Sequence, residues 1–166
     1  MNPTSHYGLK ILYSWTNWTA SVRRKHQRRS RSQQERRWLA GLGQFKELLE
    51  NRGCGVAIMD LTWCGGISEA RRISALVEAA HTSVAFHDCT GPIALAASTH
   101  MALNAENCFV QEMVRAFYYG WYGDLVTQLP PVEKGRIRAP EGAGLGLELN
   151  ADRLAQPDVH IRRSDA

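Results

Sequence analysis

The sequence predicts an α/β fold built on a parallel sheet, beginning near residue 44. Three short apolar stretches, 56–60, 83–87 and 108–112, have the continuous apolar character of strands covered on both faces. Between them, residues 68–80 and 92–103 carry apolar side chains at helical spacing. The order strand–helix–strand–helix–strand with short connections is typical of parallel crossover units.

Local signals set the expected ends of the helices. A first helix is indicated by the apolar stripe of Phe45, Leu48 and Leu49, and the segment 51–53 ends it at a glycine. The pair Gly65 and Gly66 turns the chain after the first strand. Ser68 is the expected N-cap of the second helix, and Pro92 suits the first turn of the third.

The rest of the chain divides into segments of different character. Residues 114–166 form a C-terminal arm and tail, with glycine and proline concentrated in 129–147 and a frayed end expected at 152–166. Residues 1–43 show no sustained periodicity, and we expect them to be poorly ordered. The chain thus divides at 1–43, 44–113 and 114–166.

The positive charge is concentrated in the N-terminal segment. The whole chain has a net charge of +4 and a pI near 9.0, but residues 1–43 alone carry +8, which leaves −4 for the remainder. The basic pI therefore describes one segment and not the expected fold. We expect a cytoplasmic protein with reduced cysteines, because neither a signal peptide nor an apolar run long enough to span a bilayer is evident.

Three polar residues end the three expected strands: Asp60, His87 and Glu112. In a parallel barrel the C-terminal ends of the strands meet on one face, where barrel enzymes place their chemistry. A single polar residue at a strand end can simply cap the strand and face water. The ordered set of Asp, His and Glu on successive strands favours a functional site.

Larger motifs around these residues resemble a known family. The segments DLTWCGGISEARRISALVEAA, VAFHDCTGPIALAAS and CFVQEMVRAFYYGWYGDLV are similar to the mandelate racemase/muconate lactonizing enzymes of the enolase superfamily, on their acid-sugar dehydratase side. In that family the sixth barrel strand ends in Asp before a Cys-Gly-Gly turn, the seventh in His and the eighth in Glu. Asp60, His87 and Glu112 match these positions.

The resemblance implies both a fold and a reaction. The expected fold is a C-terminal fragment, about strands six to eight, of a (β/α)₇β barrel. Asp60 would orient His87, which would move a proton beside a substrate carboxylate, as dehydratases and racemases do. Glu112 would donate a hydrogen bond to the enediolate oxygen. The family binds Mg²⁺ through acidic residues on strands three to five.

Those strands are not recognisable here, so an N-terminally truncated and inactive remnant is expected, without tight binding of Mg²⁺. A sugar-acid substrate would then require the missing half of the barrel. The inner sheet face, expected to carry Val56, Ile58, Val84 and Phe86 or their alternates, would be left uncovered. Uncovered apolar faces and open strand edges predict self-association or aggregation.

One hypothesis for the basic segment is translation out of frame. With GC-rich codons, a shifted frame turns Leu9 through Thr19 into PEDPLQLDELD and Arg24 through Glu35 into PQTPTPIAVAAG, which resemble the strand-four and strand-five motifs of the family. Glu35 would then be the first residue in frame and the strand-five metal ligand. Genomic codons incompatible with that frame would exclude the hypothesis.

Two alternatives belong to other functional classes. The basic segment with its tryptophans could bind nucleic acid through phosphate contacts and stacking, which salt-sensitive binding by residues 1–43 would reveal. We do not favour it. A zinc site from Cys54, Cys64, His87 and Cys89 is also conceivable, but the sequence contains no C-x-x-C pair.

Overall fold

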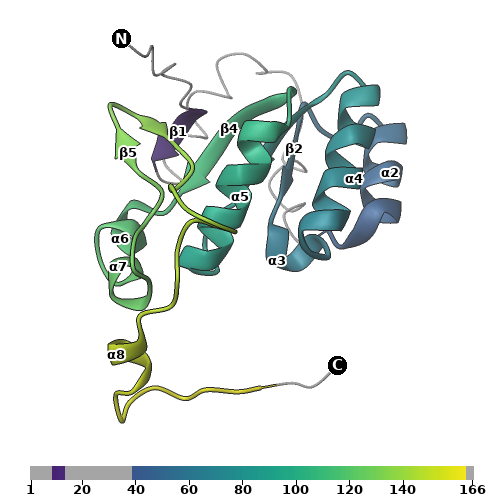
Figure 1. Ribbon diagram of the computed structural model, residues 1–166. Helices are drawn as coiled ribbons and strands as arrows, with labels where there is room; N and C mark the ends of the chain where they lie inside the picture. The colour runs from purple at the N-terminus through teal and green to yellow at the C-terminus, as the bar shows by residue number, and fades with distance from the viewer. Residues whose placement is uncertain (1–8, 14–38, 164–166) are drawn as a thin grey trace.

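Six strands form one sheet in the order β2-β3-β4-β1-β6-β5 (Figure 1). The computed structural model describes residues 9–13 and 39–163. The strands are β1 (Leu9–Tyr13), β2 (Val56–Met59), β3 (Ser83–Phe86), β4 (Cys108–Met113), β5 (Val132–Glu133) and β6 (Arg136–Ile137). The helices are α2 (Gly41–Glu50), α3 (Leu61–Cys64), α4 (Gly66–Ala79), α5 (Pro92–Asn104), α6 (Arg115–Tyr118), α7 (Tyr122–Leu125) and α8 (Ala151–Leu154).

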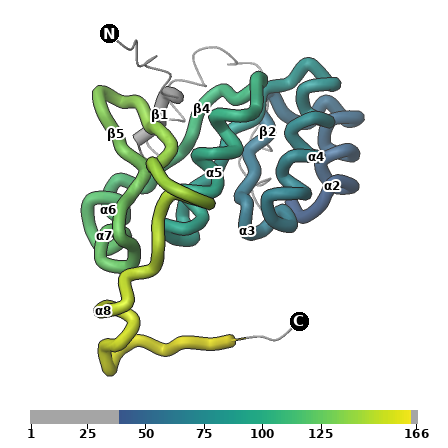
Figure 2. The backbone as a smooth tube through the Cα atoms, in the orientation of Figure 1, coloured from purple at the N-terminus to yellow at the C-terminus, as the bar shows by residue number. Residues whose placement is uncertain are grey.

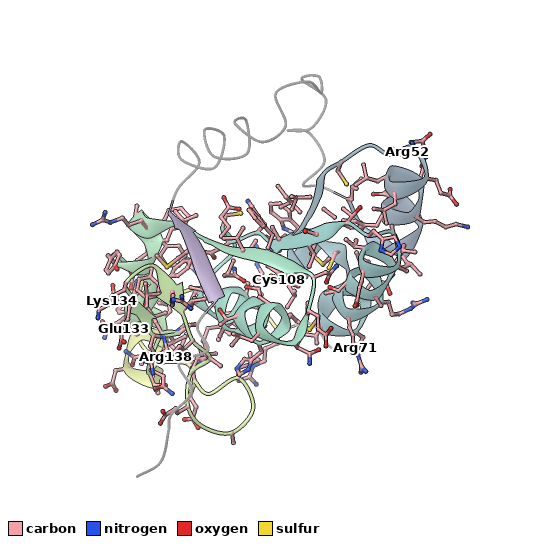
Figure 3. The ribbon with its side chains drawn as sticks, turned by 90° about the horizontal axis from the view of Figure 1, so that it is seen from above. Arg52, Arg71, Cys108, Glu133, Lys134 and Arg138 are labelled. Carbon is pink, nitrogen blue, oxygen red and sulfur yellow. The ribbon has the colours of Figure 1, made fainter. Side chains whose placement is uncertain are left out.

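The three expected strands pair in parallel, as predicted, with β3 between β2 and β4. Helices α2, α4 and α5 lie on one face of this sheet (Figures 1 and 3). The view from above also shows charged residues such as Arg52 and Arg71 at the periphery, whereas Cys108 lies toward the middle (Figure 3). Parallel strands joined by covering helices are therefore the frame that positions the site.

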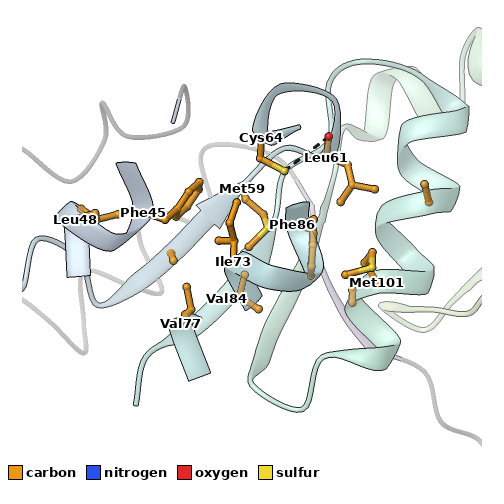
Figure 4. Close-up of a cluster of buried hydrophobic side chains, with 14 residues drawn as sticks. Phe45, Leu48, Met59, Leu61, Cys64, Ile73, Val77, Val84, Phe86 and Met101 are labelled. Atoms are coloured by element: carbon orange, nitrogen blue, oxygen red, sulfur yellow. Dashed lines mark hydrogen bonds between the residues drawn. The ribbon is translucent and has the colours of Figure 1, made fainter. Parts of the chain in front are cut away.

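The main core fills the space between the sheet and these helices (Figure 4). Its largest fully buried members include Phe45 from α2, Met59 from β2, Phe86 from β3 and Ile73 from α4. Burying each such side chain contributes roughly 1.5–3 kcal/mol. The buried Cys64 thiol donates to the Leu61 carbonyl at 3.7 Å within the same cluster.

One expectation about the sheet faces needs correction. Val84 lies opposite Ala57, and Phe86 lies opposite Met59, so these side chains share the helix-covered face. The other face therefore carries Val56 and Ile58, with their register partners Ser83 and Ala85. The prediction grouped Val84 and Phe86 with Val56 and Ile58 because sequence alone does not give the register between strands.

Helix ends agree with the prediction in place but not always in detail. Helix α2 ends where expected, yet the left-handed residue is Arg52 (φ 49°), and the Gly53 amide donates to the Leu48 carbonyl. Helix α4 is capped by Gly65, so Ser68 lies inside the helix and is not its N-cap. Gly65 has φ 116°, a conformation that favours glycine.

Strand β1 was not expected, because it lies inside the segment 1–43. It pairs in parallel with β4, placing Leu12 opposite Glu112, and antiparallel with β6. Strands β5 and β6 form a two-residue hairpin within the arm that was expected to be irregular. Its turn residues Lys134 and Gly135 have φ values of 49° and 74°, as a type I′ turn requires.

After the hairpin the chain crosses α5, where Leu145 packs against the main core, and the segment from α8 onward then extends away from the body of the fold (Figures 1 and 2). Val126 bridges to Leu149, and Asn150 then caps the short helix α8. Arg153 of α8 pairs with Asp158 at 2.7 Å on the surface. Among the described residues, no helix combines the length and apolar character that a membrane crossing requires.

These edges and faces generate a prediction about association. Strand β2 ends the sheet, and several large apolar side chains of the described chain are exposed, including Phe109 at 46% and Ile67 at 50%. Because an open strand edge beside apolar surface favours association, we expect oligomers or aggregates whose apparent mass rises with concentration. Size-exclusion chromatography with light scattering measures this. A monodisperse monomer with one sharp calorimetric transition would contradict it.

Candidate active site

Strand register brings the three strand-end residues into one row. Met59 lies opposite Phe86, and Phe86 lies opposite Gln111. The next residues are therefore Asp60, His87 and Glu112: the first two directly follow β2 and β3, and Glu112 is the last residue but one of β4. The three lie side by side near the carboxyl ends of these strands. The predicted convergence of these residues is confirmed in geometry, while their roles in a reaction stay predictions.

Asp60 is held by hydrogen bonds on both oxygens. It is the N-cap of α3, where Oδ1 accepts from the Thr62 amide at 2.8 Å and from the Thr62 hydroxyl at 2.5 Å. Oδ2 lies 3.0 Å from Nδ1 of His87. Burial alone would raise the pKa of Asp60, but the hydrogen bonds from His87 and Thr62 outweigh it, so the pKa lies below its usual value.

His87 is placed between two carboxylates. Its Nδ1 faces Asp60, and its Nε2 lies 3.8 Å from Oε2 of Glu112. Only 5% of the His87 side chain is exposed, and the ring of Trp63 lies 5.6 Å from its own, centroid to centroid. An ionised Asp60 favours the tautomer in which Nδ1 carries the proton, which leaves Nε2 as the basic nitrogen beside Glu112.

Asp88 is a buried carboxyl that the sequence did not single out. Its Oδ2 accepts from the Val114 amide and its Oδ1 from the Tyr122 hydroxyl, both at 3.0 Å. These bonds tie the loop after β3 to the segment after β4 and to α7. Burial raises the pKa of Asp88 to about 6, with a further contribution from Glu112.

Thr62 is the second residue that the sequence analysis missed. An Asp-x-Thr sequence after a strand signals a cap in which the carboxylate accepts from the backbone two residues later. That signal was present at 60–62. No comparable local pattern marks Asp88, because its partners are 26 and 34 residues away.

The described residues hold one cluster of three or more metal-ligating side chains: Asp60, His87 and Cys89, with their ligand atoms within 4.8 Å of one another. This set does not fit Mg²⁺, which prefers an octahedron of oxygen ligands. Of the four residues considered for zinc, Cys54 and Cys64 are not part of the cluster. Glu35, the metal ligand expected under the shifted-frame hypothesis, lies outside the described residues.

A separate apolar groove of about 430 Å³ opens between α3, α5 and α7. Ile67, Ile93, Trp121 and Leu149 line it and are all substantially exposed. The residues that line it do not include Asp60, His87 or Glu112. Because its surface is almost wholly apolar, it does not suit a polyhydroxylated acid, and we do not assign it as the substrate site.

Comparison with known proteins places this geometry in a family. Residues 37–153 match the model of the enolase C-terminal domain-like family, which covers more than half of the chain. The chain belongs to this family. The resemblance that rested on Asp60, His87 and Glu112 is thereby confirmed, and so is the prediction of part of a parallel barrel.

Relatives in the family include sugar-acid dehydratases. The chain is 32% identical over 126 residues to D-galactonate dehydratase of Variovorax paradoxus, covering 73% of this chain and 32% of the relative. It is 33% identical over 107 residues to D-xylonate dehydratase of Haloferax volcanii, covering 64% and 26%. A crystal structure of an enolase of the mandelate racemase subgroup from Agrobacterium tumefaciens matches with 55% identity and a TM-score of 0.66, covering 69% and 31%. The chain thus spans about a third of the length of these relatives.

The raised pKa of Asp88 predicts a pH-dependent stability. The folded chain binds this proton more tightly than the unfolded chain, so the contribution is fully present below pH 3.8 and is lost as pH rises through about 6. In Asp88→Asn, the free energy of unfolding relative to wild type should therefore rise by on the order of 3 kcal/mol between pH 4 and pH 7. Urea unfolding across this range measures it.

The matched control is Asp124→Asn, which removes an exposed carboxyl from α7. It should follow the wild-type profile, because its side chain is hydrated in both states. Parallel profiles for Asp88→Asn and wild type would show that Asp88 binds its proton no more tightly in the folded chain.

Proposed function

We propose that Asp60, His87 and Glu112 are the acid–base part of an enolase-superfamily active site that acts on sugar acids by dehydration or racemisation. The observation that carries the proposal is the position of His87, which lies 3.0 Å from Asp60 through Nδ1 and 3.8 Å from Glu112 through Nε2. The similarity to D-galactonate dehydratase and D-xylonate dehydratase supports sugar acids as the substrate class.

Each residue has a distinct role in this proposal. Asp60, fixed by Thr62, holds the Nδ1 proton of His87, and Nε2 then takes a proton from the carbon beside a carboxylate. Alternatively, protonated His87 gives a proton to a departing β-hydroxyl, which is the dehydratase variant. Glu112 in its protonated form donates a hydrogen bond to the enediolate oxygen that develops.

The described part of the chain lacks some of the groups that the reaction needs. The proton on the carbon next to a carboxylate is very weakly acidic, so its removal has a high barrier. The family resemblance implies that Mg²⁺ lowers this barrier. The described residues do not fit Mg²⁺, and the chain spans about a third of its relatives. We therefore propose that the isolated chain is inactive unless residues from outside this chain complete the site.

The tautomer of His87 gives a direct test of the Asp60 contact. ¹⁵N NMR at neutral pH should show Nδ1 of His87 protonated in wild type, because the Asp60 carboxylate accepts a hydrogen bond from Nδ1–H. The Asp60→Asn variant should show a mixture of tautomers. His100 is an internal control, since its Nε2 lies 3.2 Å from the Leu145 carbonyl and must carry the proton there. Observation of the Nε2–H tautomer at His87 in wild type would remove the proposed base.

Activity assays test the remaining part. With Mg²⁺ and a panel of aldonic acids, we expect no 2-keto-3-deoxy product above background and no exchange of the proton beside the carboxylate. His87→Ala is the control for contaminating activity. Turnover by the wild-type chain that disappears in His87→Ala would show that the chain is a complete enzyme.

A further inference from the structure

We propose that Asp60, His87 and Cys89 form a binding site for a thiophilic divalent cation such as Zn²⁺. Each residue offers one ligand atom, and these atoms lie within 4.8 Å of one another. Asp60 and His87 are buried, whereas Cys89 is partly exposed in the loop after β3. Three protein ligands leave the fourth tetrahedral position for water.

The distances between the ligand atoms agree with a tetrahedral zinc centre. Bond lengths of about 2.0–2.1 Å to nitrogen and oxygen and about 2.3 Å to sulfur imply edges of about 3.4 Å for N···O and about 3.6 Å for N···S. Nδ1 of His87 lies 3.0 Å from Oδ2 of Asp60 and 3.7 Å from Sγ of Cys89. The third pair, Asp60 and Cys89, lies within 4.8 Å, so side-chain shifts of up to about an ångström would close the site.

Thr62 and Glu112 contact the ligand residues and orient their side chains, as the hydrogen-bonding neighbours of metal ligands do. Thr62 occupies Oδ1 of Asp60, so Oδ2 is the oxygen that faces His87. If Nδ1 binds a cation, Nε2 carries the ring proton, and Nε2 faces the Glu112 carboxylate at 3.8 Å. A histidine ligand whose other nitrogen faces a carboxylate is the usual arrangement in zinc proteins.

The chemistry of the donors selects the kind of cation. One thiolate, one imidazole and one carboxylate suit Zn²⁺ or Co²⁺ and disfavour Mg²⁺. A cation here would also offset the negative charge of Asp60, which is almost fully buried. The site therefore differs in its metal preference from an oxygen-rich magnesium centre.

Occupancy would have a consequence that rests on the proposed function. The cation would take Nδ1 of His87 and Oδ2 of Asp60, the two atoms whose shared proton orients the base. Binding of Zn²⁺ and acid–base action by His87 would then exclude each other in any completed form of the enzyme. Cation binding itself does not depend on activity and can be measured without it.

Cobalt spectroscopy on the full chain tests the proposal. Titration of the reduced protein with Co²⁺ should produce a thiolate-to-cobalt charge-transfer band in the near ultraviolet and visible bands of tetrahedral intensity. One equivalent of Zn²⁺ should abolish both. The Cys89→Ser variant should lose the charge-transfer band, and His87→Gln should weaken Co²⁺ binding at least tenfold, since loss of one ligand lowers affinity strongly.

The matched control is Cys54→Ser, because Cys54 is also partly exposed but lies outside the cluster. It should retain the wild-type spectrum. A charge-transfer band that persists in Cys89→Ser, or a wild-type titration without one, would overturn the proposal. Far-ultraviolet circular dichroism of each variant identifies loss of fold, and Zn²⁺-dependent protection of Cys89 from alkylation in wild type tests the site without any substitution.

Discussion

The contact between Asp60 and His87 depends on a single structural constraint, the register of three parallel strands. Both groups are nearly inaccessible to water, and a buried carboxylate is costly unless it accepts hydrogen bonds. Pairing of Met59 with Phe86 places the two side chains side by side, and the N-terminus of α3 supplies the Thr62 donors. A shift of one residue between β2 and β3 would turn one of the two side chains to the opposite face and leave the other unpaired.

Features that depend on local sequence patterns could be predicted, whereas features that depend on contacts between distant parts of the sequence could not. Apolar runs and helical stripes are local, so β2, β3, β4, α4 and α5 could be placed from sequence. The row formed by Asp60, His87 and Glu112 could be predicted because parallel strands bring their carboxyl ends to one edge. Asp88 could not, because its role comes from contacts with Val114 and Tyr122 across long sequence separations.

Strand β1 could not be predicted for a different physical reason. Pairing with β4 uses backbone groups, which every residue but proline supplies, so five residues can join a sheet edge without a distinctive pattern of side chains. The edge strand β2 has the corresponding backbone groups at the other end of the sheet, where an open edge can accept a further strand.

Asp60 and Asp88 are buried carboxyls whose pKa values shift in opposite directions, and this difference explains why Asp60 can bind either a proton or a cation. Asp60 and Asp88 are equally inaccessible, yet the pKa of Asp60 lies below its usual value and that of Asp88 is raised to about 6. At Asp88, desolvation outweighs the hydrogen bonds from Val114 and Tyr122, whereas at Asp60 the hydrogen bonds from His87 and Thr62 outweigh desolvation. An ionised oxygen held against an imidazole nitrogen can share either a proton or a metal ion with it. Cys89 adds the soft ligand that favours the metal, and a serine at that position would leave only the proton.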